Sequence, residues 1–389
     1  MNYEFPTIYS IEQAIAAVDG ADEFVIAEKD GYTIFNYNVV MPDTFPEVET
    51  LGDAIRRECR GLVFDSNGEV LSRRLHKFFN VGEKDETQLS ALSLFEPHVI
   101  LEKLDGSMIT PLILDGDVYW ATKMGHETDV AKSASKFVDS VKDTMDYNGL
   151  AVLACYHKIT PIFEYCSPKH RIVVDYPEEK MVLIAVRDNM NGSYWSYDGI
   201  VSWAKLFNVP VVREYPGTPE DMTKLVEMTK GQEEGEGWIV RFGDGHMVKI
   251  KSEHYLRIHR TKSDLQYERN LVSLIINNEL DDLKGMLPTE DVDKIVEFER
   301  EFWGKYFDVL RYLNDVYSYY HQQSNSRAEF ADLVLQNRNP LFRGILFGMH
   351  DGKNSNDLLL DTIKKYLTKN VKYENMKAQL LPNLKDWRY

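Results

Sequence analysis

The hydrophobic pattern of the chain changes character once, close to Lys251. Before that point, short runs of β-branched and aromatic residues alternate with turn-forming residues, a pattern typical of β-strands. After it, apolar residues recur at spacings of three and four, as they do on one face of an α-helix. The length of 389 residues also exceeds the usual size of a single-core domain. We therefore expect an α+β fold with two domains, residues 1–252 and residues 253–389.

The β-rich part has the turn chemistry of hairpins rather than of βαβ units. The turn sequences Asn67-Gly68, Asp115-Gly116 and Gly243-Asp244-Gly245 each lie between two strand-like runs. Residues of these types adopt the positive φ angles that join antiparallel neighbours. We expect antiparallel sheets with a few helices. The expected strands are 24–27, 32–40, 61–64, 118–122, 161–165, 181–186, 237–242 and 247–251.

The C-terminal part contains one long amphipathic helix. Its apolar stripe begins at Ile295 and continues at helical spacing to Tyr320. Asn339-Pro340 and Asp351-Gly352 interrupt the helical pattern further on. The expected shorter helices are 327–336, 341–348 and 357–367, which makes this an all-α domain.

The chain is acidic, with 45 Lys and Arg against 62 Asp and Glu and a formal net charge of −17. A polyanion would therefore have to bind at a local basic patch, for which Arg56-Arg57, Arg73-Arg74 and the run 257–262 are candidates. Three scattered cysteines fit a reducing compartment such as the cytoplasm rather than a disulfide framework. Neither a signal peptide nor a membrane span is expected.

The common phosphate-binding and hydrolase motifs are missing from the sequence. Neither G-x-x-x-x-G-K-[ST] nor G-x-G-x-x-G occurs, HExxH and CxxC are absent, and the histidines show no metal-site spacing. The tetrapeptide Lys103-Leu104-Asp105-Gly106 follows the strand-like run 99–102. Alone it is a weak signal, because a lysine entering an Asp-Gly turn is common and Lys29-Asp30-Gly31 is a similar string.

The context of Lys103 is more specific. The accompanying motifs, in chain order, are Glu58-Cys59-Arg60-Gly61, His76-Lys77-Phe78-Phe79-Asn80, Thr122-Lys123, Phe163-Glu164-Tyr165, Lys180 to Arg187, Glu236-Gly237-Trp238-Ile239 and Lys249-Ile250-Lys251-Ser252. This ordered set resembles the covalent nucleotidyltransferase superfamily of ATP-dependent ligases and capping enzymes, and within it the phage-type RNA ligase 1 family. The resemblance covers nearly the whole chain. It implies an N-terminal nucleotidyltransferase domain, an ATP-grasp-like ligase fold, followed by an all-α RNA-recognition domain.

Elementary chemistry supports several of these positions. A lysine attacks phosphorus only as the neutral amine, so a nucleophilic lysine needs nearby cations and partial burial. Lys249 and Lys251 are two apart on an expected strand, so both would point into one cleft and neutralise phosphate charge there. Hairpin pairing would bring Glu236 towards Lys251, where its carboxylate could hold a metal ion or a lysine. Each of these side chains is otherwise an ordinary surface charge.

The resemblance implies a complete set of site residues. Lys103 is implied to be the catalytic nucleophile, with Asp105 and Gly106 shaping its turn. Asp281 and Asp282 are implied to bind a metal ion, although an acidic first turn of a helix explains them equally well. The sequence has Thr-Lys-Met-Gly where the family pattern places glycine directly after the lysine. The implied ATP-binding residues are Tyr37, Arg60, Lys77, Lys123, Glu164, Glu236, Lys249 and Lys251.

The implied activity is ATP-dependent RNA ligation. AMP would pass from ATP to Lys103 and then to a 5′-phosphate of RNA, after which a 3′-hydroxyl would seal the strand. The implied cofactors are ATP as co-substrate and Mg2+ or Mn2+, and the implied partner is RNA with 5′-phosphate and 3′-hydroxyl ends, including nicked tRNA. An end-healing kinase or phosphatase and a host cytoplasm are implied by the same likeness. Two alternatives stay open, a DNA ligase or capping-type nucleotidyltransferase and a catalytically silent RNA-binding module.

Overall fold

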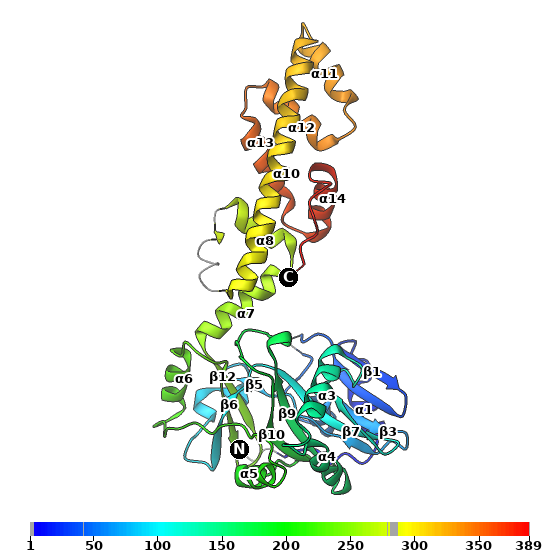
Figure 1. Ribbon diagram of the computed structural model, residues 1–389, viewed down its shortest axis with the longest axis vertical. Helices are drawn as coiled ribbons and strands as arrows, with labels where there is room; N and C mark the ends of the chain where they lie inside the picture. The colour runs from blue at the N-terminus through cyan, green and yellow to red at the C-terminus, as the bar shows by residue number, and fades with distance from the viewer. Residues whose placement is uncertain (1–3, 42, 278, 281–286, 389) are drawn as a thin grey trace. The chain divides into compact units, whose positions relative to one another are not determined.

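The computed structural model describes residues 4–41, 43–277, 279–280 and 287–388. The chain divides into two compact units, Met1–Leu256 and Arg257–Tyr389 (Figure 1). The described strands all belong to the first unit, and the described part of the second unit contains helices and their connections. The α+β architecture with a helical C-terminal region is therefore confirmed.

The described strands form three four-stranded sheets, ordered β1-β2-β3-β4, β10-β9-β7-β8 and β5-β12-β11-β6. Neighbouring strands are antiparallel, as expected, except that β5 and β12 run parallel. The strands are β1 Phe24–Lys29, β2 Tyr32–Tyr37, β3 Leu62–Asp65, β4 Val70–Ser72, β5 Phe79–Asn80, β6 His98–Lys103, β7 Ser107–Leu114, β8 Asp117–Ala121, β9 Ile159–Cys166, β10 Lys180–Asp188, β11 Gly237–Phe242 and β12 Met247–Lys251.

The three turn sequences identified in the sequence close hairpins. Gly68, Gly116 and Gly245 have φ angles of 78°, 90° and 91°, values that glycine adopts without steric cost. They connect β3 to β4, β7 to β8 and β11 to β12. The local turn chemistry thus determines which strands are neighbours.

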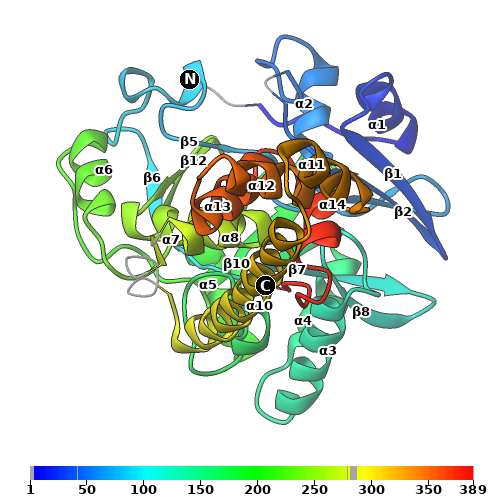
Figure 2. The same ribbon diagram turned by 90° about the horizontal axis from the view of Figure 1, so that it is seen from above.

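Helices cover the sheets of the first unit. Helices α3 and α4 pack on β7, β8 and β9 (Figure 2). Trp120, Tyr147 and Phe163 form the centre of an aromatic core between them. Helix α6 packs against β11 and β12. The helices of this unit are α1 Ile11–Val18, α2 Leu51–Glu58, α3 Asp129–Val141, α4 Tyr147–Tyr156, α5 Tyr197–Leu206 and α6 Met222–Lys230, and α7 begins in it.

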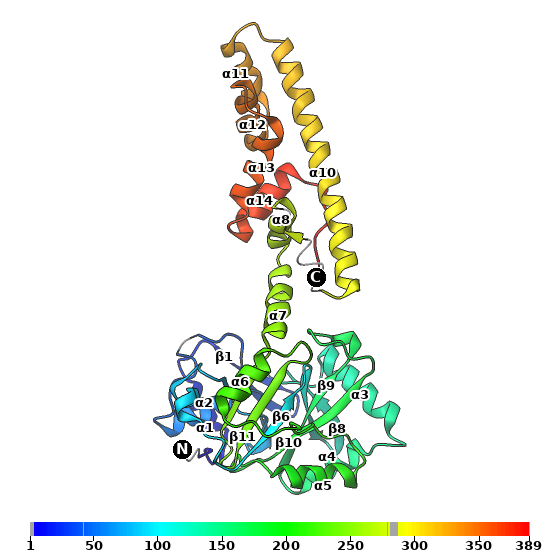
Figure 3. The ribbon, with the colours of Figure 1, turned by 90° about the vertical axis from the view of Figure 1, so that its left-hand side faces the viewer.

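The second unit is organised around one long helix, α10 Thr289–Gln322, against which α8, α11, α12 and α13 pack (Figure 3). Its predicted apolar stripe is buried at Ile295, Phe298, Phe302, Tyr306 and Leu313. No helix of the described residues combines the length and the apolar character that a membrane span requires. The other helices are α7 Glu253–Leu265, α8 Glu268–Ile276, α11 Arg327–Gln336, α12 Pro340–His350, α13 Ser355–Tyr366 and α14 Asn370–Leu380.

Two of the basic runs considered for an RNA surface are largely inside the first unit. Arg57, Arg73 and Arg74 are 1%, 0% and 2% exposed. Arg57 pairs with Glu86 at 2.6 Å and Arg73 pairs with Glu58 at 3.0 Å, while Arg74 donates hydrogen bonds to backbone carbonyls. The prediction of an RNA surface at these three residues is wrong, because the fold itself uses their guanidinium groups.

Candidate active site

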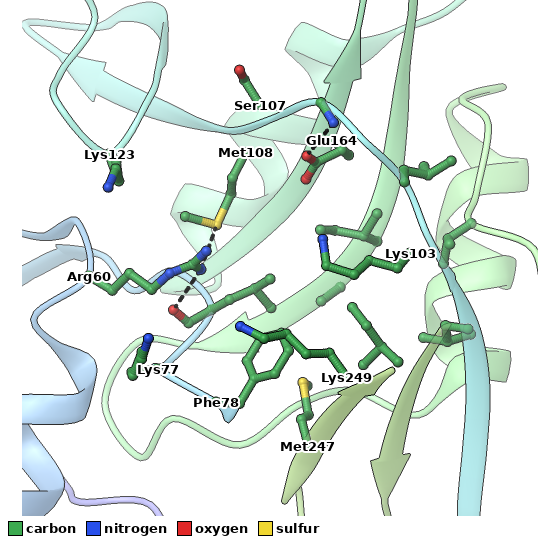
Figure 4. A pocket seen from close by; sticks show the side chains of 18 of the residues that line it. Arg60, Lys77, Phe78, Lys103, Ser107, Met108, Lys123, Glu164, Met247 and Lys249 are labelled. Atoms are coloured by element: carbon green, nitrogen blue, oxygen red, sulfur yellow. Dashed lines mark hydrogen bonds between the residues drawn. The ribbon is translucent and has the colours of Figure 1, made fainter. Parts of the chain in front are cut away.

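A cavity of about 550 Å³ opens in the first unit, and residues of β6, β7, β11 and β12 are among those that line it (Figure 4). It brings together eight of the nine residues predicted to act on ATP, which come from motifs spread over more than 200 positions of the chain. The ninth, Glu236, is ion-paired with two of them. The eight lining residues are Tyr37, Arg60, Lys77, Lys103, Lys123, Glu164, Lys249 and Lys251.

Strand register places Lys103 and Lys251 on either side of β11. Gly237 of β11 is opposite Lys103 of β6 on one side and opposite Lys251 of β12 on the other. Glu236 is 3% exposed, and its carboxylate forms ion pairs with both lysines. Its oxygens lie 2.7 Å from Lys103 Nζ and 2.9 Å from Lys251 Nζ. Gly237 has a φ of 140°, and a Cβ there would lie 2.0 Å from the carbonyl oxygen of Ile250. Only glycine lets the strands approach closely enough for this arrangement.

The turn after Lys103 is anchored by Asp105. One carboxylate oxygen of Asp105 accepts the backbone N–H groups of Val173 and Val174 at 2.8 and 2.7 Å, and the other accepts the hydroxyl of Tyr255 at 2.8 Å. Asp105 is 3% exposed. With both oxygens engaged and shielded from solvent, this carboxylate orients the lysine turn and is not placed for proton transfer.

Glu164 lies behind the same turn and accepts the backbone N–H of Gly106 at 3.1 Å. Burial raises the pKa of Glu164 to about 7, an effect that Lys103 opposes and Glu236 reinforces. A Cβ on Gly106 would lie 2.4 Å from the carbonyl oxygen of Tyr165, so glycine is required for the turn to approach β9. Burial therefore favours the protonated form of the Glu164 carboxyl group more than it does for an exposed glutamate.

Four cations gather in the cavity, where Figure 4 shows Arg60, Lys77, Lys123 and Lys249 directed towards a common space. Lys77 Nζ and Lys123 Nζ lie 5.7 and 5.0 Å from the centre of the Tyr37 ring. Burial acts to raise the pKa of Tyr37, but Arg60, Lys77 and Lys123 outweigh it and lower that pKa. The wall therefore carries positive charge that attracts a polyanion.

Lys249 is the lysine whose charge is most affected by this crowding. Burial lowers its pKa to about 7, and Lys77, Arg60 and Lys103 add to the effect by repulsion. Its Nζ lies 5.6 Å from the centre of the Phe78 ring. An anion entering the cavity would stabilise the ammonium form of Lys249, because opposite charge favours the protonated state.

Two tyrosines complete the site although no sequence signal indicated them. Tyr255 donates to Asp105 across 150 positions of sequence, and the backbone N–H of Asp105 donates to the hydroxyl of Tyr176 at 3.0 Å. Neither residue belongs to a charged motif. The predicted metal ligands Asp281 and Asp282 lie outside the described residues.

A lysine at a strand end, held by a buried glutamate and facing a cation-lined cavity, is an arrangement suited to covalent nucleotidyl transfer. Two family models match the chain, one described as RNA ligase over residues 58–255 and one described as T4 RNA ligase 1, C-terminal domain, over residues 262–376. The chain belongs to the T4 RNA ligase 1 family and is an RNA ligase.

Named relatives agree with this family. A protein of Thermovibrio ammonificans with the provisional name RNA ligase is 31% identical over 289 residues, 70% of each chain. RNA ligase 1 of bacteriophage TS2126 is 28% identical over 252 residues, which are 62% of this chain and 60% of that protein. Among solved structures, an archaeal ATP-dependent RNA ligase shares 13% identity over 66% of this chain and 64% of its own, with a TM-score of 0.45.

Proposed function

We propose that the chain seals RNA in three ATP-dependent steps with Lys103 as the nucleophile. The neutral amine of Lys103 forms a bond to the α-phosphorus of ATP, and the bond to the departing pyrophosphate breaks. A 5′-phosphate oxygen of RNA then displaces Lys103 from the AMP, and a 3′-hydroxyl finally displaces AMP to join the strand. The observation that carries the proposal is the pairing of Glu236 with both Lys103 and Lys251, beside a cavity lined by Arg60 and Lys249.

The cavity suits a nucleoside triphosphate by charge. Arg60, Lys77, Lys123 and Lys249 line it together with Glu164. Such a cation group would offset the charge that builds up on the phosphates during transfer. ATP, rather than GTP, is proposed from the family and from the archaeal neighbour's printed name.

A divalent ion, Mg2+ or Mn2+, is proposed to enter with the triphosphate. Within the described ranges no three His, Cys, Asp or Glu side chains are grouped to hold a metal. Both carboxylate oxygens of Glu236 are already paired with lysines, so the described residues do not fit a resident ion. A solved ligase of Naegleria gruberi is described with ATP and Mn, which is a property of that protein.

The test is incubation of the full chain with Mg2+ and ATP labelled at the α-phosphate, followed by mass analysis of the intact protein and its peptides. We expect one AMP adduct, on the peptide containing Lys103, that 5′-phosphorylated RNA removes. An adduct removed by nicked DNA but not by RNA would favour a DNA ligase, and labelling by GTP would favour a capping-type enzyme. RNA binding without any adduct would favour the catalytically silent module.

We also propose that the second unit contacts the RNA. Its residues 257–389 contain 20 Lys and Arg and 20 Asp and Glu, so the formal charge of −17 belongs entirely to residues 1–256. Four exposed lysines surround the connection between α13 and α14, and the described structure records no ion pair for them: Lys364 and Lys365 in the last turn of α13, Lys369 in the connection and Lys372 in the first turn of α14, together called the lysine turn. Two exposed acids, Asp361 and Glu374, flank this lysine turn. It is the type of local basic patch that RNA requires on an acidic protein.

Replacing Lys364, Lys365, Lys369 and Lys372 together by Gln tests the lysine turn. We expect RNA binding to weaken on the order of 10-fold or more, and the dependence of log Kd on log salt to fall by roughly 3, because about four phosphate contacts are lost. Lys103 adenylation without RNA should not change. The matched control replaces four exposed lysines of the first unit by Gln: Lys132, Lys136, Lys142 and Lys205. An equal loss of RNA binding in the control would contradict the assignment.

Nicked tRNA as the natural RNA and a cytoplasmic site of action complete the proposal. Three free cysteines, Cys59, Cys155 and Cys166, fit a reducing compartment.

The provisionally named bifunctional polynucleotide kinase/RNA ligase of Autographa californica nuclear polyhedrosis virus is 27% identical over 59% of this chain, and the match spans 35% of the viral protein. Because that name joins kinase and ligase in one protein, we propose that an end-healing enzyme prepares the RNA ends for this chain.

A further inference from the structure

Arg241 of β11 differs from the other buried arginines because the described residues provide neither an ion pair nor a recorded hydrogen bond for its guanidinium group. The five buried arginines among the described residues are Arg57, Arg73, Arg74, Arg187 and Arg241. Arg57, Arg73 and Arg187 are ion-paired, and Arg74 donates three hydrogen bonds. The Arg241 side chain is 5% exposed, and its buried Nη1 atom has no hydrogen-bond partner among the described residues.

The recorded contact of the Arg241 guanidinium is the ring of Tyr194, whose centre is 5.9 Å away. Burial lowers the pKa of Arg241, and no carboxylate contributes to offset this effect. A buried polar donor without a partner reduces the stability of the fold, and a charged one does so more strongly. Such a cost is commonly retained where a ligand supplies the missing acceptor.

The position of Arg241 indicates which ligand this is. Arg241 lines the 550 Å³ cavity that contains Lys103, and it also lines a neighbouring cavity of about 450 Å³. The neighbouring cavity carries Asp198, Glu214 and Asp244, whose negative charge disfavours a ligand that presents acceptor atoms there. The cavity that contains Lys103 is therefore the better source of an acceptor.

Strand register gives the place of Arg241 within that cavity. Along β11, the row of Lys103, Gly237 and Lys251 is followed by the row of Ile239 and Lys249, and then by the row of Arg241 and Met247. At about 3.4 Å per residue, Arg241 lies about 14 Å along the strand from the Lys103 row. This span is comparable with the length of a nucleotide whose α-phosphate is at Lys103.

The surroundings of Arg241 at this end are apolar. Leu75, Ala185, Ile239 and Met247 line the cavity and belong to one hydrophobic cluster with Tyr194. A flat base fits such walls, whereas a phosphate here would lose its hydration to apolar side chains. Building on the proposed function, we propose that the Arg241 guanidinium donates a hydrogen bond to a ring nitrogen of the ATP base, and that it is a specificity-determining residue.

The test compares ATP with its 1-deaza, 3-deaza and 7-deaza analogues, each of which lacks one acceptor nitrogen. Dissociation constants are measured by calorimetry in the Lys103→Ala background, with Arg241 either retained or replaced by Met. With Arg241 retained, we expect one analogue to bind roughly 10-fold to 100-fold more weakly than ATP, the range of one hydrogen bond to a charged donor. With R241M, ATP itself should weaken by that factor, and ATP and this analogue should bind equally.

The unliganded R241M chain provides an independent readout. Removing an unpaired buried charge should leave its melting temperature unchanged or higher. A clear decrease would show that Arg241 serves the fold, and would overturn the inference. The control Arg327→Met removes an exposed arginine of the second unit that is paired with Asp351, and it should leave ATP binding unchanged.

The remaining outcomes are also decisive. The inference is wrong if the three analogues bind like ATP while Arg241 is retained, or if R241M preserves the same ratios between the nucleotides. Weaker binding of all four nucleotides by one common factor would assign Arg241 to the phosphates instead. Failure of the wild-type chain to form a lysyl-AMP adduct would contradict the proposed function. The relative affinities for ATP and its deaza analogues test the role of Arg241 alone.

Discussion

Lys103→Ala is expected to abolish the AMP adduct, a loss on the order of 10⁴-fold or more, because the variant has no amine to attack phosphorus. Lys103→Arg should be equally inactive, since a guanidinium keeps a positive charge beside Glu236 but is not deprotonated in proteins. Lys103→Ala removes both the amine and its charge, whereas Lys103→Arg removes only the amine. Comparing the two variants shows whether the reaction requires the nucleophile or only a positive charge at this position. The measurement is incorporation of the α-phosphate label, with the melting temperature recorded for each variant.

Lys29→Ala is the matched control for this result. Lys29-Asp30-Gly31 is the other Lys-containing Asp-Gly turn discussed above, and its lysine forms only a loose ion pair with Glu127 at 3.7 Å. Its labelling should equal that of the wild type. Residual labelling of Lys103→Ala at the wild-type rate would mean that another residue is the nucleophile.

Glu58→Gln is expected to have the largest effect on stability. The Glu58 carboxylate is buried between two guanidinium groups, with Arg187 at 2.6 Å and Arg73 at 3.0 Å. A neutral amide would leave both cations without a counter-charge, and breaking a buried pair in this way costs about 3–5 kcal/mol. For a unit of this size the melting temperature should fall by roughly 10 °C, measured by calorimetry.

The same carboxylate predicts a pH dependence. Burial acts to raise the pKa of Glu58, but Arg187 and Arg73 outweigh it and lower the pKa from 4.5 to about 2. A lowered folded-state pKa contributes stability above the unfolded-state value, and that contribution is lost as the pH falls from about 4.5 towards 2. The shift corresponds to about 3 kcal/mol. The stability difference between wild type and Glu58→Gln should therefore shrink over this acidic range.

The control for Glu58 is Glu102→Gln. Glu102 binds Arg213, whose side chain is 77% exposed, so this pair should contribute at most about 1 kcal/mol. A Glu102→Gln variant as unstable as Glu58→Gln would show that loss of any bidentate arginine pair, rather than burial, determines the effect. A flat acid profile for the Glu58 difference would contradict the burial argument.

Several parts of this protein could be predicted from sequence because their signals are local. Asn67-Gly68 and Asp115-Gly116 specify their turns within a few residues, and the alternation around Lys249 and Lys251 places both on one strand face. The stripe beginning at Ile295 specifies α10 in the same way. The order of the charged motifs also indicated the family, which the family models confirm.

Other properties depend on contacts between distant segments, for which a linear pattern has no counterpart. Arg73 resembles a surface cation in sequence, but in the folded unit it pairs with Glu58, which lies 15 positions earlier in the chain. The hydroxyl of Tyr255 donates a hydrogen bond to Asp105 across 150 positions, and the sequence around either residue does not predict this contact.

The sequence by itself determined the strands, the hairpin turns, the long helix and the set of chemically active residue types, because periodicity and turn geometry act over a few neighbouring residues. Only the tertiary structure decided which charges are compensated. Glu58 satisfies Arg73 and Arg187, whereas Arg241 lies in the wall of the cavity without a partner among the described residues. The physical reason is that burial and pairing of a charge are set by the segments that pack around it, and these are brought together by folding rather than by proximity in the chain.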